Sequence, residues 1–290
     1  IRQSQTSEFM IRSLPVLFLM MLIIASCNTS LSPESSPFSG SSPWPEIRKE
    51  RMEALLPAAM ERAGVESWTV LCRSNDNDPL AMHVGCENAV APAVFLFQLQ
   101  DDQLFSIVFT PPGEAAALRD IALHDSIAVV NRTPGALVEA ADYINRNVRG
   151  NLALNFSETN ELADGLSYSQ YVRFTDMLIQ QVKNRIVSSE DLVFEWLSVK
   201  TPAEVEILRQ AAELTSQWQY EVYETIVPGE TTDKDVAKFL EAKMAEAGVG
   251  NAWSPDQNPN VNSGPDRGHA HPTDKVIRPG DVIQIDFGIR

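Results

Sequence analysis

The residues best suited to chemistry lie near the end of the sequence, in the stretch GHAHPTDKVIRPGDVIQIDFG between Gly268 and Gly288. His269 and His271 are two of only four histidines, and Asp286 follows an apolar run that reads as a strand. Side chains two residues apart point the same way in an extended segment, so two histidines at this spacing can chelate a cation. The carboxylate of Asp286 is a hard oxygen ligand for a divalent cation. These residue types indicate metal-assisted chemistry.

Each of these residues also has a structural interpretation, which is the favoured one when it is considered alone. Asp286 can accept hydrogen bonds from the turn amides before Gly288, and a polar loop commonly carries solvated histidines. His83 and His124 have no neighbouring ligand types, so we interpret them as structural. The sequence has no Walker loop, dinucleotide-binding glycine pattern, paired-cysteine zinc site or GxSxG turn.

The central part of the sequence alternates short apolar runs with helical patterns. A helix from Glu46 to Gly64 is predicted to bend at Pro57. Strands are predicted at Trp68–Leu71, Val94–Leu99, Leu104–Phe109, Ile127–Val130 and Leu152–Phe156, and helical patterns at 137–148 and 168–187. This mixture predicts one α/β domain over residues 46–195.

A second domain is predicted from residue 196 to residue 290. Residues 201–204, TPAE, form a capping box with proline at the first helical position, and this helix ends at Pro228-Gly229. Thr232 is predicted to cap a second helix that Gly248 stops. Pro279-Gly280 then turns the chain into a strand over 282–287.

The strings KTPAEVEILRQAAELTSQ, IVPGETTDKDVAKFLEAKMAEAG, VNSG and GHAHPTDKVIRPGDVIQIDFG, in this order, resemble the M24-type pita-bread metallopeptidases. That family includes Xaa-Pro aminopeptidases, prolidases, methionine aminopeptidases and creatinases. Asp286-Phe287-Gly288 is most similar to the Xaa-Pro aminopeptidase and prolidase branch. The resemblance implies an α/β (α+β) fold, in which a creatinase-like N-terminal domain precedes the first part of a pita-bread catalytic domain.

The resemblance also implies a reaction. Family members hold two divalent metal ions, such as Mn, Co or Zn, with two Asp, one His and two Glu, and hydrolyse the N-terminal peptide bond of short peptides. By this resemblance Asp286 is the first metal ligand, His269 contacts the substrate, and His271 is a neighbour without a fixed role. In the family the N-terminal domain shapes the narrow end of the cleft and aids oligomerisation, so the resemblance implies short peptide substrates and a possible homodimer.

The other four ligands of the family lie downstream of the position of Arg290. We therefore expect this chain to be a fragment that binds no metal and is inactive by itself. We also expect its C-terminal end to be marginally stable, because the strand 282–287 leaves an apolar edge. Two alternatives are a non-catalytic pita-bread module that binds a peptide or protein partner, and a metal-free, creatinase-like amidinohydrolase.

The N-terminal residues 1–27 are expected to precede the fold. Arg12 is followed by an uncharged apolar run to Ser26, which is short for a membrane span and typical of a secretory signal. The run ends at Cys27 in a stretch that resembles a bacterial lipoprotein box, which implies lipid on the Cys27 thiol. An uncleaved anchor with an incidental cysteine is the alternative. Residues 28–45 read as a Ser/Pro-rich tether.

Charge and cysteine content limit the location and the partners. A formal charge of −16 argues against nucleic acid as a partner, because phosphate binding requires a basic surface. It also means that acyl chains, not electrostatics, would hold the protein to a membrane in the cell envelope. Cys72 and Cys86 can pair in an oxidising compartment or remain as two buried thiols.

Overall fold

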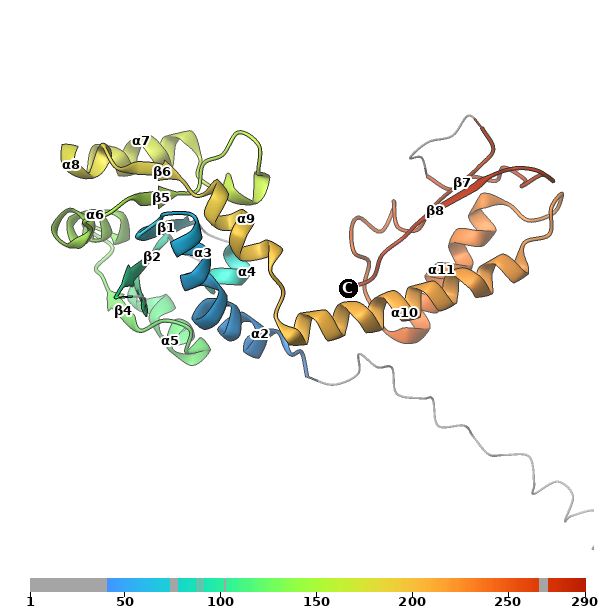
Figure 1. The fold of residues 1–290 in the computed structure, drawn as a ribbon, viewed down its shortest axis with the longest axis horizontal. Helices are drawn as coiled ribbons and strands as arrows, with labels where there is room; N and C mark the ends of the chain where they lie inside the picture. Colours follow the sequence, from blue (N-terminus) through green and yellow to red (C-terminus); the bar gives the residue numbers. More distant parts are fainter. Residues whose placement is uncertain (1–40, 74–77, 88, 90, 102, 266–270) are drawn as a thin grey trace, which may run out of the picture. The chain divides into compact units, whose positions relative to one another are not determined.

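The computed structural model describes residues 41–73, 78–87, 89, 91–101, 103–265 and 271–290. The described residues divide into two compact units, 41–213 and 214–290, each with its own hydrophobic core (Figure 1). The change from one unit to the other falls inside the long helix α10 (Pro202–Thr225). Cys27 and most of the predicted tether lie outside the described residues. Across the ranges given above, the helices all lack the combination of length and apolar composition that a membrane span requires.

A six-stranded mixed sheet forms the centre of the unit 41–213, in the order β4-β3-β2-β1-β5-β6 (Figure 1). The strands are β1 (Ser67–Cys72), β2 (Ala93–Gln100), β3 (Gln103–Thr110), β4 (Ser126–Val129), β5 (Leu152–Leu154) and β6 (Ile186–Ser188). β2 is antiparallel to both of its neighbours, whereas the β3–β4, β1–β5 and β5–β6 pairs are parallel. The five predicted strands and the α/β class are confirmed.

Strand β2 shows why the sheet is central. Phe95 and Phe97 belong to the hydrophobic core on one face of the sheet, and Val94 and Leu96 belong to the core on the other face. All four side chains are fully buried. A strand that is buried on both faces reads as a continuous apolar run, as the first five residues of β2, AVFLF, do.

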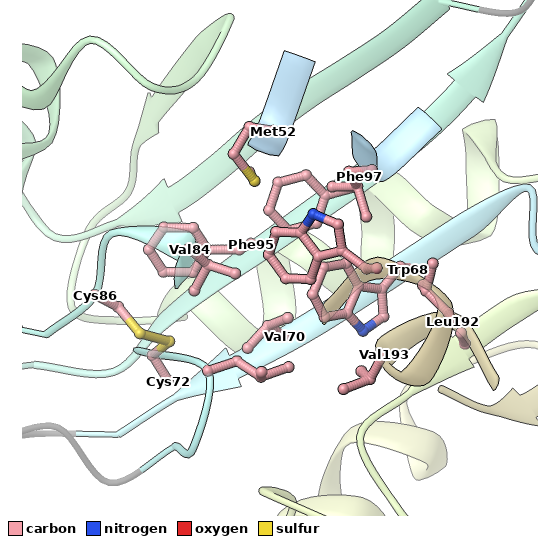
Figure 2. Close-up of a cluster of buried hydrophobic side chains, with 14 of the residues drawn as sticks. Met52, Trp68, Val70, Cys72, Val84, Cys86, Phe95, Phe97, Leu192 and Val193 are labelled. Carbon is pink, nitrogen blue, oxygen red and sulfur yellow. A yellow bond between two sulfur atoms is a disulfide. The ribbon is translucent and has the colours of Figure 1, made fainter. Parts of the chain in front are cut away.

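Helices cover both faces of this sheet. The first face is covered by the π-helical turn η2 (Arg51–Leu55), α3 (Leu56–Arg62), α4 (Ala81–Val84), α5 (Pro112–Ile121), the short 3₁₀ helix η3 (Glu161–Ala163) and α9 (Glu190–Ser198). The helix α2 (Trp44–Glu50) leads into η2. Figure 2 shows this core around Trp68, Phe95 and Phe97. The second face is covered by α6 (Ala136–Asn147), α7 (Tyr168–Asp176) and α8 (Gln180–Lys183).

The helix changes type just before Pro57, where a bend is predicted. The turn before this proline is π-helical, over Arg51–Leu55, and α-helix resumes at Leu56. Proline has no backbone N–H to donate to the carbonyl four residues earlier, so the helix cannot keep its regular hydrogen bonds there.

The prediction of one helical pattern over 168–187 was wrong. α7 ends at Asp176, α8 is a single turn, and β6 begins at Ile186. The side chain of Asn145, on α6, donates to the carbonyl of Met177 (3.0 Å) and accepts from the amide of Ile179 (2.9 Å). A side chain from another helix thus replaces the helical hydrogen bonds at this point, which apolar periodicity does not reveal.

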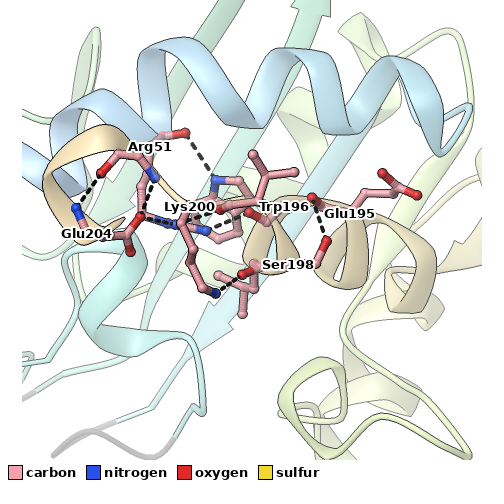
Figure 3. Close-up of polar contacts among 9 residues, drawn as sticks. Arg51, Glu195, Trp196, Ser198, Lys200 and Glu204 are labelled. Carbon is pink, nitrogen blue, oxygen red and sulfur yellow. Dashed lines mark hydrogen bonds and ion pairs between the residues drawn. The ribbon is translucent and has the colours of Figure 1, made fainter. Parts of the chain in front are cut away.

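Arg51 joins the π-helical turn to the segment that leads into α10. It is 1% exposed, and its Nη1 donates to the carbonyl of Val199 (3.1 Å) and to Oε2 of Glu204 (2.7 Å). Its Nη2 donates to the carbonyl of Trp196 (2.5 Å), and Trp196 Nε1 donates back to the Arg51 carbonyl (3.0 Å; Figure 3). Glu204 also completes the predicted capping box by accepting from the Thr201 amide at 2.7 Å.

A disulfide joins Cys72, at the end of β1, to Cys86, just after α4 (Figure 2). Both cysteines are 2% exposed and belong to the core around Trp68. Of the two sequence-based alternatives for this pair, the structure has the paired one. The bridge closes a segment that carries α4 and His83.

The unit 214–290 contains the second half of α10, α11 (Asp233–Ala247), β7 (Asn260–Ser263) and β8 (Ile283–Asp286). Its core gathers Trp218, Val222, Val236, Ala237, Leu240, Met244, Val261 and Ile277. The predicted caps of α11 are confirmed. Thr232 forms a capping box with Asp235, and Gly248 ends the helix with a φ of +68°. An ion pair between Lys243 and Glu221 (2.6 Å) links α11 to α10.

Candidate active site

Asp286 is the last residue of β8, which pairs with β7 in antiparallel register. Ile283 and Ile285 pack against the core of the unit, as does Phe287 beyond the strand. Because side chains alternate along a strand, Gln284 and Asp286 lie on the opposite face of the hairpin. The carboxylate is therefore directed away from the apolar core, and it is partly buried.

The strand β7 places two amide side chains on this same face. Asn260 pairs with Asp286 and Asn262 pairs with Gln284, whereas Val261 faces the core. Asn260 is 7% exposed and Asn262 is 2% exposed. The Nδ2 of Asn262 donates to the Oδ1 of Asn260, and the Oδ1 of Asn262 has no hydrogen-bond partner. Sequence analysis did not single out either asparagine. The signal was visible, because Asn260 and Asn262 alternate with the apolar Val261 as residues on one face of a strand do.

Asn258 stabilises the turn after β8 through both ends of its side-chain amide. The amide of Gly288 donates to Oδ1 of Asn258 (3.0 Å), and Nδ2 of Asn258 donates to the carbonyl of Gly288 (2.7 Å). A Cβ at position 288 would lie 2.9 Å from Ala252 and Trp253, so glycine is required there by close packing. The Asp-Phe-Gly string thus combines a carboxylate on the polar face with a glycine that the fold needs.

His269 lies outside the described residues, so its predicted contact with substrate stays a prediction. The described segments before and after His269 are joined to the start of α11 and to each other by hydrogen bonds. The amide of Ser263 donates to Oδ2 of Asp233 (3.3 Å), the amide of Asp233 donates to the carbonyl of Lys275 (3.0 Å), and Lys275 Nζ donates to the carbonyl of Ser263. These three residues join the end of β7 to the segment that precedes β8.

His271 lies in an exposed segment of the chain. Its Nδ1 donates to the carbonyl of Asp256 at 2.5 Å. The Ser254 hydroxyl donates to the carboxylate of Asp256 and is the main reason that the pKa of this carboxyl lies below its usual range; the nearby imidazole adds to the effect. This contact joins His271 to the segment around Asp256, and its predicted role as a neighbour of the site stays a prediction.

His83 and His124 belong to the other unit and are structural there. His83 contacts the rings of Trp44 and Trp196 edge-on, and His124 contacts Phe95 and Phe97. Burial lowers the pKa of both imidazoles to about 4, and for His83 the nearby charge of Arg51 lowers the pKa further. Both side chains are therefore neutral near pH 7.

A dinuclear metal centre requires several converging anionic or imidazole ligands. Over the described ranges, no three His, Cys, Asp or Glu side chains come together in a way that could hold a metal ion. The donors that are present have the right chemistry for a hard cation, since one carboxylate and one buried amide oxygen without a partner lie on a single face. These residues could supply part of the ligand set of such a site.

Residues 206–290 match the model of metallopeptidase family M24. This region includes α11, the β7–β8 hairpin and Asp286, and the match confirms the predicted M24-type relationship of this part of the chain. No curated protein matches the sequence.

The fold is similar to solved structures of peptidases. An Xaa-Pro dipeptidase from Bacillus anthracis superimposes with a TM-score of 0.52 at 18% identity, over 84% of this chain and 61% of that one. An X-Pro aminopeptidase from Thermotoga maritima gives 0.53 at 21%, over 80% and 60%. A prolidase from Pyrococcus horikoshii gives 0.51 at 15%, over 83% and 60%. At these identities the likeness shows the fold, and the chain spans about three fifths of each of these proteins.

Proposed function

We propose that the protein is a metal-dependent peptidase of the Xaa-Pro aminopeptidase or prolidase type, which hydrolyses the N-terminal peptide bond of short peptides. The observation that carries the proposal is the position of Asp286. It lies inside the region that matches family M24, at the end of β8, on the polar face of the hairpin. The substrate class is supported by the three similar structures, which are an Xaa-Pro dipeptidase, an X-Pro aminopeptidase and a prolidase.

In this proposal Asp286 contributes one carboxylate ligand, and His269 contacts the substrate. When bound, two divalent cations such as Mn, Co or Zn supply an activated water and polarise the scissile carbonyl. The contribution of the described residues is to hold the Asp286 carboxylate at the end of a strand whose other face is fixed in the core of the unit.

We also propose that the protein is exported and held at a membrane by lipid on Cys27. The disulfide between Cys72 and Cys86 supports an oxidising compartment, since such bonds are rare where thiols are kept reduced. Mass analysis of the protein from cell membranes tests the lipid, because each acyl chain adds a defined mass. Peptides that retain an unmodified Cys27 would contradict this part of the proposal.

The direct test of the peptidase is the Asp286→Ala variant. In the protein expressed from its natural gene, with manganese or cobalt added, we expect this variant to lose more than about a hundredfold in the hydrolysis of Xaa-Pro dipeptides and tripeptides, because a metal ligand is removed. Asp274→Ala, which removes an exposed carboxylate (85% side-chain exposure), is the matched control and keeps full activity.

Two results would count against the proposal. Equal activity of the wild type and Asp286→Ala would remove Asp286 from the site. Binding of Xaa-Pro peptides without cleavage and without metal would favour a non-catalytic module instead. The 290-residue chain expressed alone is expected to show no turnover above its own Asp286→Ala variant.

A further inference from the structure

Strand β7, whose Val261 packs in the core of the unit 214–290, has an unusual composition for a strand. Two of its four residues, Asn260 and Asn262, are asparagines, which are depleted in strands. Both side chains are more than nine-tenths buried, although they lie on the face opposite to the apolar core. Burying an amide costs free energy unless it is hydrogen-bonded, so two such residues on one face call for a specific polar role.

The register identifies what these amides are placed against. Asn260 lies directly opposite Asp286, where the Cβ atoms of a cross-strand pair are about 4.5–5.5 Å apart. Asn262 lies one pair further along, opposite Gln284, on the same face. The residue directly opposite Asp286 in the hairpin therefore carries an amide, and neither a carboxylate nor an apolar side chain.

The hydrogen bond between the two asparagines sets the orientation of Asn260. Because Nδ2 of Asn262 donates to Oδ1 of Asn260, the acceptor end of Asn260 is already engaged. An amide donates only through its nitrogen, so the group that Asn260 presents to a carboxylate is an N–H. A carboxylate accepts at two oxygens, and carboxylates that bind metal ions are in turn held by hydrogen bonds from neighbouring donors.

We propose that Asn260 is a positioning residue for Asp286: its amide N–H, oriented by Asn262, holds the carboxylate in the direction required to bind a divalent cation. This inference rests on the proposed function, because it assigns Asp286 to a metal. Asn262 acts one step further away, and its unpartnered Oδ1 lies on the same polar face.

The test measures metal affinity as well as activity. In the protein expressed from its natural gene, titration calorimetry with manganese gives the affinity, and the absorption spectrum of the cobalt form reports the geometry of the site. Asn260→Leu keeps the side-chain volume and removes the donor, and we expect a loss of about 10–100-fold in metal affinity with a changed cobalt spectrum. Asn262→Leu should give a smaller loss in the same direction. Asn260→Ser, which retains a donor, should recover part of the affinity.

Gln284→Leu is the matched control, since Gln284 lies on the same face of the hairpin but is exposed. We expect its affinity and spectrum to equal those of the wild type. Equal losses in all three leucine variants, or no loss in Asn260→Leu, would overturn the role of Asn260. A wild type that binds manganese but cleaves no peptide would refute the proposed function while the affinity series still tests Asn260. A wild type that binds no metal would overturn both.

Discussion

Arg51 illustrates how a single buried charge ties distant segments together. Its guanidinium bonds to two carbonyls at the end of α9 and beyond it, and to the carboxylate of Glu204 at the start of α10. The Trp196 ring also lies 5.7 Å from the guanidinium carbon. A buried ion pair adds little to stability compared with apolar packing, but removal of one partner leaves the other charge without compensation.

We therefore expect Arg51→Ala to lower the free energy of unfolding of the unit 41–213 by about 3–5 kcal/mol. Arg209→Ala is the control. It breaks an exposed pair with Glu206, with side chains 57% and 52% exposed, and should change stability by less than about 1 kcal/mol. Urea unfolding followed by tryptophan fluorescence measures both. Equal effects of the two substitutions would show that the Arg51 network is not important for stability.

The two buried imidazoles give the unit 41–213 a defined pH dependence. Their pKa values of about 4 in the folded state lie below the ordinary value of 6.5. Between these values the unfolded chain binds protons that the folded chain does not, so stability is highest above pH 6.5 and falls as the pH drops toward 4. Each histidine contributes up to about 3 kcal/mol to this loss.

The His124→Gln variant isolates one of these contributions. Glutamine keeps a donor for the carbonyl of Val84, which His124 contacts at 2.9 Å, but it does not titrate. We expect the difference in unfolding free energy between pH 7 and pH 4 to be smaller in the variant than in the wild type. Urea titrations at several pH values test this, and parallel curves for the two proteins would contradict it.

At the scale of elements, the disulfide holds α4 against the sheet. The segment that it closes has a sequence separation of 14 residues and carries His83, whose ring contacts Trp196 on α9. Glu87, which directly follows Cys86, pairs with the buried Arg48 of α2 at 2.8 Å. The bridge lowers the conformational entropy of the unfolded chain and holds the segment that makes these contacts close to the sheet.

Reduction should therefore destabilise the unit 41–213 by about 3 kcal/mol, the value expected for closing a loop of this length. The comparison is between thermal unfolding with and without dithiothreitol. The double variant Cys72→Ala/Cys86→Ala should resemble the reduced protein and should not respond to the reductant. Equal stability of the oxidised protein, the reduced protein and the double variant would mean that the disulfide makes no contribution to stability.

At the scale of the whole molecule, the described residues have separate hydrophobic cores in the units 41–213 and 214–290. Leu240 is fully buried in the core of the second unit. We expect Leu240→Ala to cost about 3–5 kcal/mol locally and to increase hydrogen exchange in α11 and β7, because a cavity forms at their contact. Leu208→Ala, at an exposed position on α10, is the control.

Exchange in β1, β2 and β3 should stay unchanged in the Leu240→Ala protein, since these strands belong to another core. Mass spectrometry of exchanged peptides separates the two regions. Equal loss of protection in both units would show that they unfold as one cooperative body.

The sequence by itself determined the features that depend on neighbouring residues. Thr201 and Thr232 begin helices because their side chains satisfy amides three residues ahead, and Gly248 ends one because it adopts a positive φ. The apolar runs of β1, β2 and β3 predicted their strands, and the order of motifs around Asp286 predicted the match to family M24.

Only the tertiary structure decided the features that join residues far apart in the chain. Asn145 interrupts the predicted helical pattern after α7, Cys72 pairs with Cys86, and the β7–β8 register brings Asn260 opposite Asp286. Local propensity concerns a few successive residues, whereas each of these contacts depends on how separate elements pack. A carboxylate becomes a candidate ligand through its sequence context, but its partners are set by the strand that lies beside it.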